Sequence, residues 1–173
     1  MITIDIVLIL MVLVLVLLLW QVSNFVSVFF GAPHVKTKVS IINKALKLVD
    51  LKKGETFYEL GSGSGDALIS ASKYNIKVIG FEISPYYYLY SKLRTLRYKN
   101  IDVNFKNILD ADLSCADIIY CYLLPKLLKK LTPKLKKELK YTARIISIGF
   151  PIKSLKLVKK IMFDNHTIYI YKK

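Results

Sequence analysis

The segment from Tyr58 to Asp66 constrains the fold of this 173-residue chain more than any other. It reads Tyr-Glu-Leu-Gly-Ser-Gly-Ser-Gly-Asp, and the helix-like run Ala67–Ala71 follows it. Glycines at every second position let the backbone turn tightly and approach a ligand closely. The N-terminus of the next helix adds unpaired N–H groups. This order of acid, glycines and helix is typical of a loop that holds a nucleotide cofactor.

The glycine spacing narrows the choice of cofactor. A dinucleotide loop reads G-x-G-x-x-G, whereas Gly61, Gly63 and Gly65 are spaced G-x-G-x-G, with Glu59 two positions before them. The pattern E-x-G-x-G-x-G resembles the first motif of class I S-adenosylmethionine-dependent methyltransferases. The resemblance implies that Glu59 lies near the methionine portion of the cofactor, often through water, and that Gly61, Ser62, Gly63 and Gly65 form the binding loop.

Two further polar residues are candidate cofactor ligands. Residues 76–82 read as a buried strand that ends in Glu82, where the resemblance implies an acid on the ribose hydroxyls. A carboxylate that accepts from two vicinal hydroxyls makes a charge-assisted, bidentate contact. Asn107 stands where these enzymes often hold an aspartate near the adenine amine, and its carbonyl accepts the same hydrogen bond. The alternatives are a glycine-rich turn with a surface glutamate, and a polar cap at a strand end. No metal ligands are predicted.

Strands and helices alternate after the loop, which predicts an α/β fold with a parallel sheet and helices on both faces. A C-terminal hairpin, with strands near 155–163 and 167–171, adds an antiparallel edge. A mostly parallel sheet closed by such a hairpin is the known shape of the class I methyltransferase, or Rossmann-like, fold. An amphipathic helix is expected at 38–50, and the other expected elements are strands 56–60, 76–82, 101–106, 116–122 and 143–149 with helices 66–74, 85–98 and 125–140.

The N-terminus predicts one transmembrane helix before this domain. The run Ile6–Trp20 is unbroken and apolar, and no charged side chain follows Asp5 until Lys36. The uncharged stretch that ends at Phe30 spans about 37 Å as a helix, enough for a tilted bilayer crossing. A cleaved signal peptide would have a basic start and a small-residue cleavage site, and a very hydrophobic core helix is the other alternative. We expect residues 1–30 to be the anchor and 31–173 the methyltransferase domain.

The charges around this helix predict its orientation. No Lys or Arg precedes the apolar run, and Lys36, Lys38, Lys44 and Lys47 follow it. The positive-inside rule therefore places the protein in the membrane as a single-pass chain with a cytoplasmic catalytic domain. The two cysteines, Cys115 and Cys121, form no C-x-x-C pair and are expected to be small core residues.

The net charge of +15 predicts attraction to phosphates, on anionic lipid or on nucleic acid. The most basic run is Leu124–Lys140, which reads as a pair of amphipathic helices with a break at Thr132-Pro133. Its lysines either form a solvated face or lie against anionic headgroups. An anionic lipid surface is the simpler partner for a domain tethered by its own helix.

Several segments resemble one specific family. The carriers are Ala32–Thr37, Tyr58–Asp66, Gly80–Pro85, Asp112–Pro125 and Pro133–Ser147. Together they are similar to the small membrane-anchored lysine methyltransferases whose mitochondrial members modify the adenine nucleotide translocase and the c-ring protein of ATP synthase. The resemblance covers about residues 31–150 and implies a membrane protein as substrate, modified on a lysine side chain.

The glycine loop departs from the usual family sequence, D-L-G-S-G-D-G-R. Glu59 replaces the first aspartate, Ser64 replaces the second, and Asp66 stands where arginine is usual. The glycines are intact, but a role for the acid–base pair of the family loop is in doubt.

Tyr122 is the predicted active-site residue. It ends the fourth strand, and ligands bind at the carboxyl edge of open α/β sheets. A lysine nucleophile must be neutral, a state that a desolvated pocket favours, and an aromatic ring could hold the amine. A packed tyrosine at the end of the strand is the alternative, and we expect Tyr122→Phe to lower turnover if the prediction holds.

Three functions remain open from the sequence: a protein-lysine methyltransferase that acts at the cytoplasmic face of the membrane, an RNA methyltransferase, and a membrane adaptor that kept the fold without the chemistry. The basic surface favours the second, although Tyr122–Pro125 is not an N/D-P-P-Y/F loop of amino-methylating enzymes. The altered glycine loop motivates the third.

Overall fold

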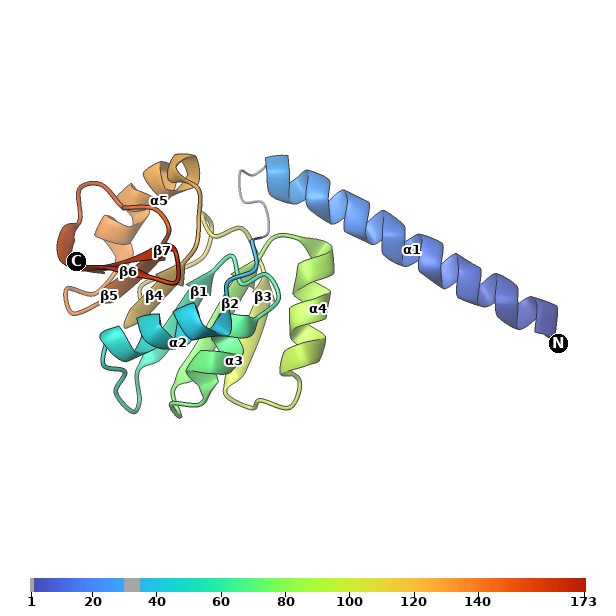
Figure 1. Ribbon diagram of the computed structural model, residues 1–173, viewed down its shortest axis with the longest axis horizontal. Helices are drawn as coiled ribbons and strands as arrows, with labels where there is room; N and C mark the ends of the chain where they lie inside the picture. Colours follow the sequence, from blue (N-terminus) through green and yellow to red (C-terminus); the bar gives the residue numbers. More distant parts are fainter. Residues whose placement is uncertain (1, 30–34) are drawn as a thin grey trace.

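A computed structural model describes residues 2–29 and 35–173 of the chain. One seven-stranded sheet forms the centre of the domain, and α1 projects away from it (Figure 1). The elements are α1 (Ile2–Phe29), α2 (Val39–Leu48), β1 (Thr56–Leu60), α3 (Asp66–Ser72), β2 (Lys77–Glu82), α4 (Pro85–Thr95), β3 (Ile101–Phe105), β4 (Ile118–Cys121), α5 (Pro125–Glu138), β5 (Arg144–Ile148), β6 (Lys156–Phe163) and β7 (His166–Lys172).

The strand order is β3-β2-β1-β4-β5-β7-β6. The first five strands in this order pair in parallel, and β7 is antiparallel to both β5 and β6. The predicted parallel sheet with an antiparallel C-terminal hairpin is confirmed. The order reverses beside β1, which pairs with both β2 and β4. Such a reversal opens a crevice at the carboxyl ends of the strands, where ligands of open α/β sheets bind.

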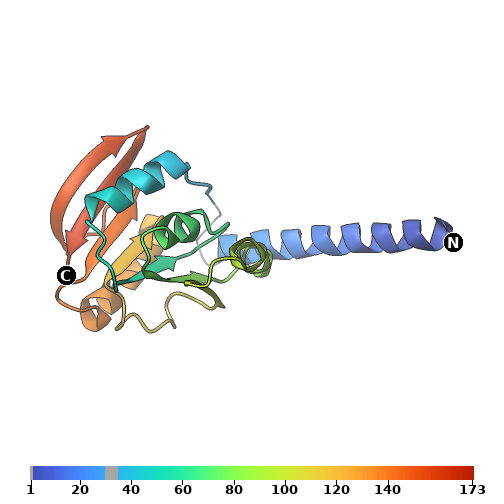
Figure 2. The same ribbon diagram turned by 90° about the horizontal axis from the view of Figure 1, so that it is seen from below.

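Helices cover both faces of the sheet. The apolar residues of α2 and α3 pack on one face with those of β1, β2 and β4, and Tyr88 of α4 joins them. Leucines of α5 cover the other face with Leu60, Ile119 and Ile145. Figure 2 shows α2 and α3 on one side of the sheet and α5 on the other. Burial of these two apolar layers is the main stabilising contribution to the domain.

The α1 helix lies against α4 and otherwise stands clear of the domain (Figures 1 and 2). Its segment Asp5–Ser23 has the length and composition of a membrane span, and only 6% of its most apolar stretch is buried. The predicted boundary at residues 30 and 31, with the start of the Ala32–Thr37 segment, lies outside the described residues.

Two predictions are wrong in detail. The run 125–138 is one continuous helix, α5, with Pro133 inside it, and not a helix pair. Proline costs the helix one N–H, but the hydroxyl of Thr132 bonds the Leu128 carbonyl at 2.7 Å, and the leucine stripe is anchored in the core. The second error is Cys115, which is exposed in the loop before β4, whereas Cys121 is buried as expected.

Candidate cofactor and active site

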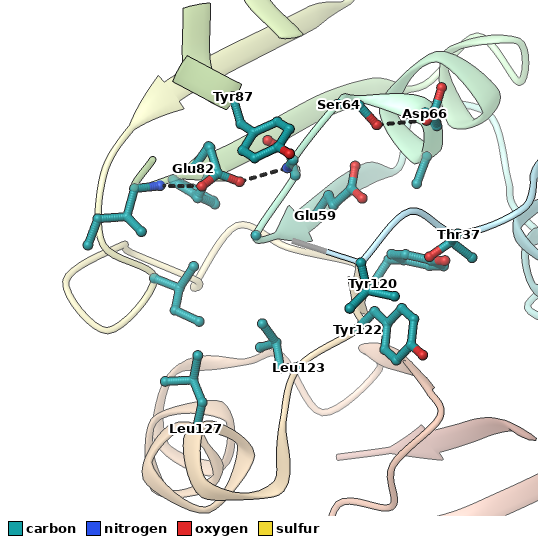
Figure 3. A pocket seen from close by; sticks show the side chains of 18 of the residues that line it. Thr37, Glu59, Ser64, Asp66, Glu82, Tyr87, Tyr120, Tyr122, Leu123 and Leu127 are labelled. Atoms are coloured by element: carbon teal, nitrogen blue, oxygen red, sulfur yellow. Dashed lines mark hydrogen bonds between the residues drawn. The ribbon is translucent and has the colours of Figure 1, made fainter. Parts of the chain in front are cut away.

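A cavity of about 340 Å³ opens at the carboxyl edge, where the strand order reverses. It lies between the glycine loop after β1, the end of β2 and the loop after β4 (Figure 3). Of the residues predicted as cofactor ligands or catalytic, all but Gly65 line it: Glu59, Gly61, Ser62, Gly63, Glu82, Asn107 and Tyr122. The sheet thus brings together residues that are up to 63 positions apart in the sequence, from Glu59 to Tyr122.

Glu82 is fixed at the end of β2 by three backbone donors. Its Oε2 accepts from the Gly63 N–H at 2.7 Å, and its Oε1 accepts from Ile83 and Ser84 at 2.9 and 2.8 Å (Figure 3). Burial raises the pKa of this carboxyl, although these hydrogen bonds oppose the rise. A carboxylate offers roughly four lone-pair positions, so about one remains, on Oε2, for a hydroxyl of a ligand. A bidentate contact, as the sequence suggested, requires one backbone donor to move.

Glu59 has a buried oxygen without a partner. The residue is 7% exposed, and its Oε2 makes no hydrogen bond within the described chain, nor does the buried Oγ of Ser62. Burial raises the pKa of the Glu59 carboxyl well above its usual value, and the charges of Glu82 and Asp66 raise it further. An unpaired buried polar atom costs about 1–3 kcal/mol, so this geometry is stabilised by any ligand that brings a cation or a donor.

The glycine loop has the backbone that the spacing predicts. Gly61, Gly63 and Gly65 adopt φ angles of 80°, 50° and 78°, a region open to glycine at little cost. Gly65 faces away from the cavity, toward α4, where an added Cβ would lie 3.3 Å from the Cβ of Ser91. Its place is structural: it caps α3 and lets α4 approach the loop.

The loop retains an acid–base pair in altered form. The guanidinium of Arg94, on α4, donates to Asp66 Oδ1 at 2.8 Å and to the Ser64 carbonyl at 2.6 Å. Ser64 donates to Asp66 Oδ2 at 2.7 Å. Burial opposes ionisation of Asp66, but these hydrogen bonds and the charge of Arg94 outweigh it and lower its pKa. A base from a different element thus pairs with the acid at the loop end, which the loop sequence alone did not indicate.

Asn107 lies on the cavity wall after β3 and also acts locally. Its Oδ1 accepts from the Leu109 N–H at 3.0 Å, as in an Asx-turn. This is the strand-end cap that stood as the alternative, and a second lone pair of the same oxygen remains for a ligand.

Tyr122 borders the cavity with its ring. Phe150 and His166 pack around that ring, with centroids 6.5 and 6.0 Å away. Gly149, at φ 78°, leaves the space that Tyr122 fills, because an added Cβ would lie 2.8 Å from Tyr122 Cε2. In Figure 3 the hydroxyl of Tyr122 points away from Glu59. The structure therefore presents the ring, and not the hydroxyl, to the cavity.

Sequence reasoning missed several side chains of the cavity. Tyr87 stands over Glu82 from the first turn of α4 (Figure 3). Tyr120, on β4, is buried beside Glu59, and burial followed by the Glu59 charge raises its pKa well above the usual value. Tyr87 follows closely on Ser84-Pro85, which could have indicated it; Tyr120 sits mid-strand and carries no such signal. Further lining residues that were not predicted are Lys36, Thr37, Leu123, Leu127 and Lys130.

Solved structures share this fold. An RNA methyltransferase from Salinibacter ruber, in complex with S-adenosyl-L-homocysteine, matches with a TM-score of 0.76 at 24% identity, over 80% of this chain and 93% of that one. A ribosomal protein L11 methylase from Lactobacillus delbrueckii subsp. bulgaricus matches with a TM-score of 0.66 at 19% identity, over 78% of each chain. The fold is that of class I methyltransferases, as predicted.

The sequence assigns the chain to a family within that class. The family described as the ANTKMT methyltransferase domain matches residues 59–159, and the chain belongs to it. A protein-lysine N-methyltransferase of Saccharolobus islandicus (strain REY15A) is 29% identical over 154 residues, 80% of this chain and 92% of that protein. The Homo sapiens lysine N-methyltransferase named for the c-ring protein of ATP synthase is 25% identical over 122 residues, which cover 69% of this chain and 52% of that protein. The chain thus spans about half the length of the human relative.

The protein is therefore an S-adenosylmethionine-dependent methyltransferase. The residues at the carboxyl edge fit this cofactor. Glu59 offers an unpaired carboxylate oxygen to a cationic group, Ser62 an unpaired hydroxyl, and Glu82 one free position to a hydroxyl. The cavity volume of about 340 Å³ is in the usual range of small-molecule sites.

Proposed function

We propose that the protein methylates a lysine side chain of a membrane-associated protein at the cytoplasmic face of a bilayer. The observation that carries the proposal is the cavity that joins the unpaired Glu59 carboxylate to the Tyr122 ring. The names of the relatives supply the substrate class, since both are lysine N-methyltransferases. In this proposal Glu59, Gly61, Ser62, Gly63, Glu82 and Asn107 bind the cofactor, Gly65 shapes the loop, and Tyr122 is the catalytic residue.

The side chains of the cavity suit a lysine nucleophile. S-adenosylmethionine supplies a methyl group, which a neutral amine accepts by displacement. Leu123 and Leu127 are buried on the side of the cavity opposite Glu82 (Figure 3). An apolar wall lowers the pKa of an entering ammonium and so favours its neutral form. The Tyr122 ring holds and aligns the amine, a contribution through proximity and orientation.

The membrane part of the proposal rests on α1. Its apolar side chains are exposed, which distinguishes it from the core helix of a soluble protein. We assign residues 1–30 to a single-pass anchor and residues 31–173 to the catalytic domain. The lysines after the span support a cytoplasmic domain, and the charge of +15 supports an anionic lipid surface as a further partner.

The test is methyl transfer by the full chain in native membranes with radiolabelled S-adenosylmethionine. We expect one labelled membrane protein, with the label on a lysine when the band is analysed by mass spectrometry. Glu59→Gln removes the charge but keeps the shape, and should abolish the label. The matched control is Asp102→Asn, a charge removal at an exposed site on β3, which should leave the label unchanged.

A second comparison tests the role of Tyr122. We expect Tyr122→Ala to lose most of the turnover and Tyr122→Phe to retain it, because the ring lines the cavity. Loss with phenylalanine as well would show that the hydroxyl acts in the reaction, as the sequence first suggested.

An RNA substrate is the second candidate, because the surface is strongly basic. Label that enters added RNA and no membrane protein would establish it and exclude the lysine proposal. Binding to RNA should then fall steeply with salt concentration.

A further inference from the structure

Helix α4 is amphipathic in the reverse sense. Leu89, Leu93 and Leu96 are 50%, 68% and 72% exposed, and their spacing of four and three residues places them on one stripe. The opposite side carries Ser91 and Thr95, which are 0% and 5% exposed and donate to carbonyls of their own helix. A surface helix of a soluble domain turns its apolar stripe to the core. The small polar residues face inward here because α4 packs closely on the Gly65 loop.

This helix begins where the apolar span ends. The backbone N–H of Tyr86, in the first turn of α4, donates to the Ser23 hydroxyl of α1 at 2.8 Å, and Ser23 is fully buried. Ser23 is also the last residue of the span that starts at Asp5. A helix of that length covers about 28 Å, close to the thickness of a bilayer core. Figures 1 and 2 both show α4 against the C-terminal part of α1. If α1 crosses a bilayer, α4 lies at its surface.

The charges of this region suit lipid headgroups. The sequence contains no Asp or Glu between Glu82 and Asp102, a stretch that includes all of α4. Arg97 and Lys99 are exposed just beyond the helix, and Tyr90 is exposed on it. Basic side chains attract anionic headgroups, and tyrosine favours the interfacial layer.

We propose that the exposed residues Leu89, Tyr90, Leu93 and Leu96, here called the leucine face, lie in the interfacial layer of an anionic bilayer beside α1. The inference rests on the proposed anchoring of the chain by α1. Four side chains are few for a protein partner, because a stable protein interface takes roughly 20–30 residues a side. Lipid needs no such area, since the adjacent anchor already holds the face at the surface.

Seating α4 in the bilayer also acts on the cofactor site. Arg94, on the same helix, holds the Ser64 carbonyl and the Asp66 carboxylate of the glycine loop. The element that contacts lipid is thus the element that braces the loop, and the cavity mouth is held near the bilayer surface.

The test places one fluorescent label on the full chain in lipid vesicles. Cys115→Ser first removes the exposed native thiol, and the buried Cys121 stays unlabelled. Leu93→Cys carries the label on the leucine face, and Met162→Cys is the matched control, because Met162 is 77% exposed on β6 at the opposite edge of the sheet. The vesicles contain phosphatidylcholine with phosphatidylglycerol.

We expect aqueous iodide to quench the Leu93 label several-fold less than the Met162 label. Lipids with a shallow spin label should quench only the Leu93 label. Equal access of iodide to both labels, in a chain that resists extraction by alkaline carbonate, would overturn the inference about α4 alone. Release of the chain by carbonate would overturn the anchoring itself, and with it this inference.

Other occupants give a different result. A second copy of the chain would shield the Leu93 label only at high protein density. Shielding that disappears on dilution to about one chain per vesicle would therefore overturn the lipid assignment. Shielding that survives dilution, and that weakens when phosphatidylglycerol is left out, would support it.

Discussion

Helices α4 and α5 cover opposite faces of the same sheet, and they distribute their leucines in opposite ways. In α5, Leu128, Leu131 and Leu135 are almost wholly buried and the lysines are exposed. In α4, Leu89 and Leu93 are exposed while small polar residues are buried. The more basic and more regularly amphipathic sequence belongs to α5, yet α4 offers an apolar face to the surroundings. Periodicity thus predicts that a helix has two faces, while the neighbours of the helix decide which one is covered.

The sharpest way to test this difference is to remove one leucine from each helix. Leu131→Ala opens a cavity in the core, because Leu131 is 0% exposed. We expect it to lower the free energy of unfolding by about 2–5 kcal/mol. Leu93→Ala removes an exposed side chain and should change it by less than about 0.5 kcal/mol in detergent micelles. Denaturant unfolding of both full-length variants checks the pair. Similar losses in the two would mean that the leucine face is covered within the protein.

A smaller effect is expected from the bond that links α4 to the glycine loop. Arg94→Gln leaves the Asp66 carboxylate, mostly buried, without its ion pair. We expect a loss of about 1–2 kcal/mol in the free energy of unfolding, reduced because the arginine is partly exposed. Cofactor affinity, measured by calorimetry, should fall as well. The matched control is Lys92→Gln, which breaks a more exposed ion pair of the same helix, with Asp102, and should cost less than about 0.5 kcal/mol.

The cost of Arg94→Gln should depend on pH with a definite sign. The folded protein holds the pKa of Asp66 below its ordinary value of 3.8. The stabilisation by this ion pair is therefore complete above that value and is lost as the pH falls through the folded pKa. The difference between wild type and variant should be largest near neutral pH and shrink below about pH 4. A difference that stays constant between pH 3 and pH 7 would show that Arg94 acts through packing.

The smallest effect concerns the lysines of α5. Lys129, Lys136 and Lys137 are exposed, and changing all three to glutamine should alter the free energy of unfolding by less than about 0.5 kcal/mol. A label at Lys137→Cys in vesicles should be as open to iodide as the label at Met162→Cys. Protection of the Lys137 label would reverse the comparison and make α5 the lipid-facing helix.

The carboxyl edge of the sheet was largely predictable from sequence. The glycine loop, Glu82 and Tyr122 all follow strand ends, and the rule that parallel strands share a carboxyl edge brings them together. Residues that act through distant neighbours were not predictable. Arg94 reaches the loop 28 residues away from Asp66, and Gly149 matters only because Tyr122 occupies the space beside it. Neither relation leaves a local pattern.

The exposure of α4 was hidden for the same reason. Its tyrosines predict packing, and Tyr88 does pack on the sheet. The burial of Ser91, however, depends on how closely the helix approaches Gly65, which is a property of the assembled domain.

The hydrogen bond between Ser23 and Tyr86 gives the anchor a second property, that of a measuring rod. The last turns of the apolar span are joined directly to the helix that overlies the cofactor loop. The catalytic cavity is therefore held at one height above the lipid and does not swing on a leash. A lysine on a tall domain or deep in the bilayer would be out of reach however well its flanking sequence matched. Selection of the substrate would then depend on altitude before it depended on sequence.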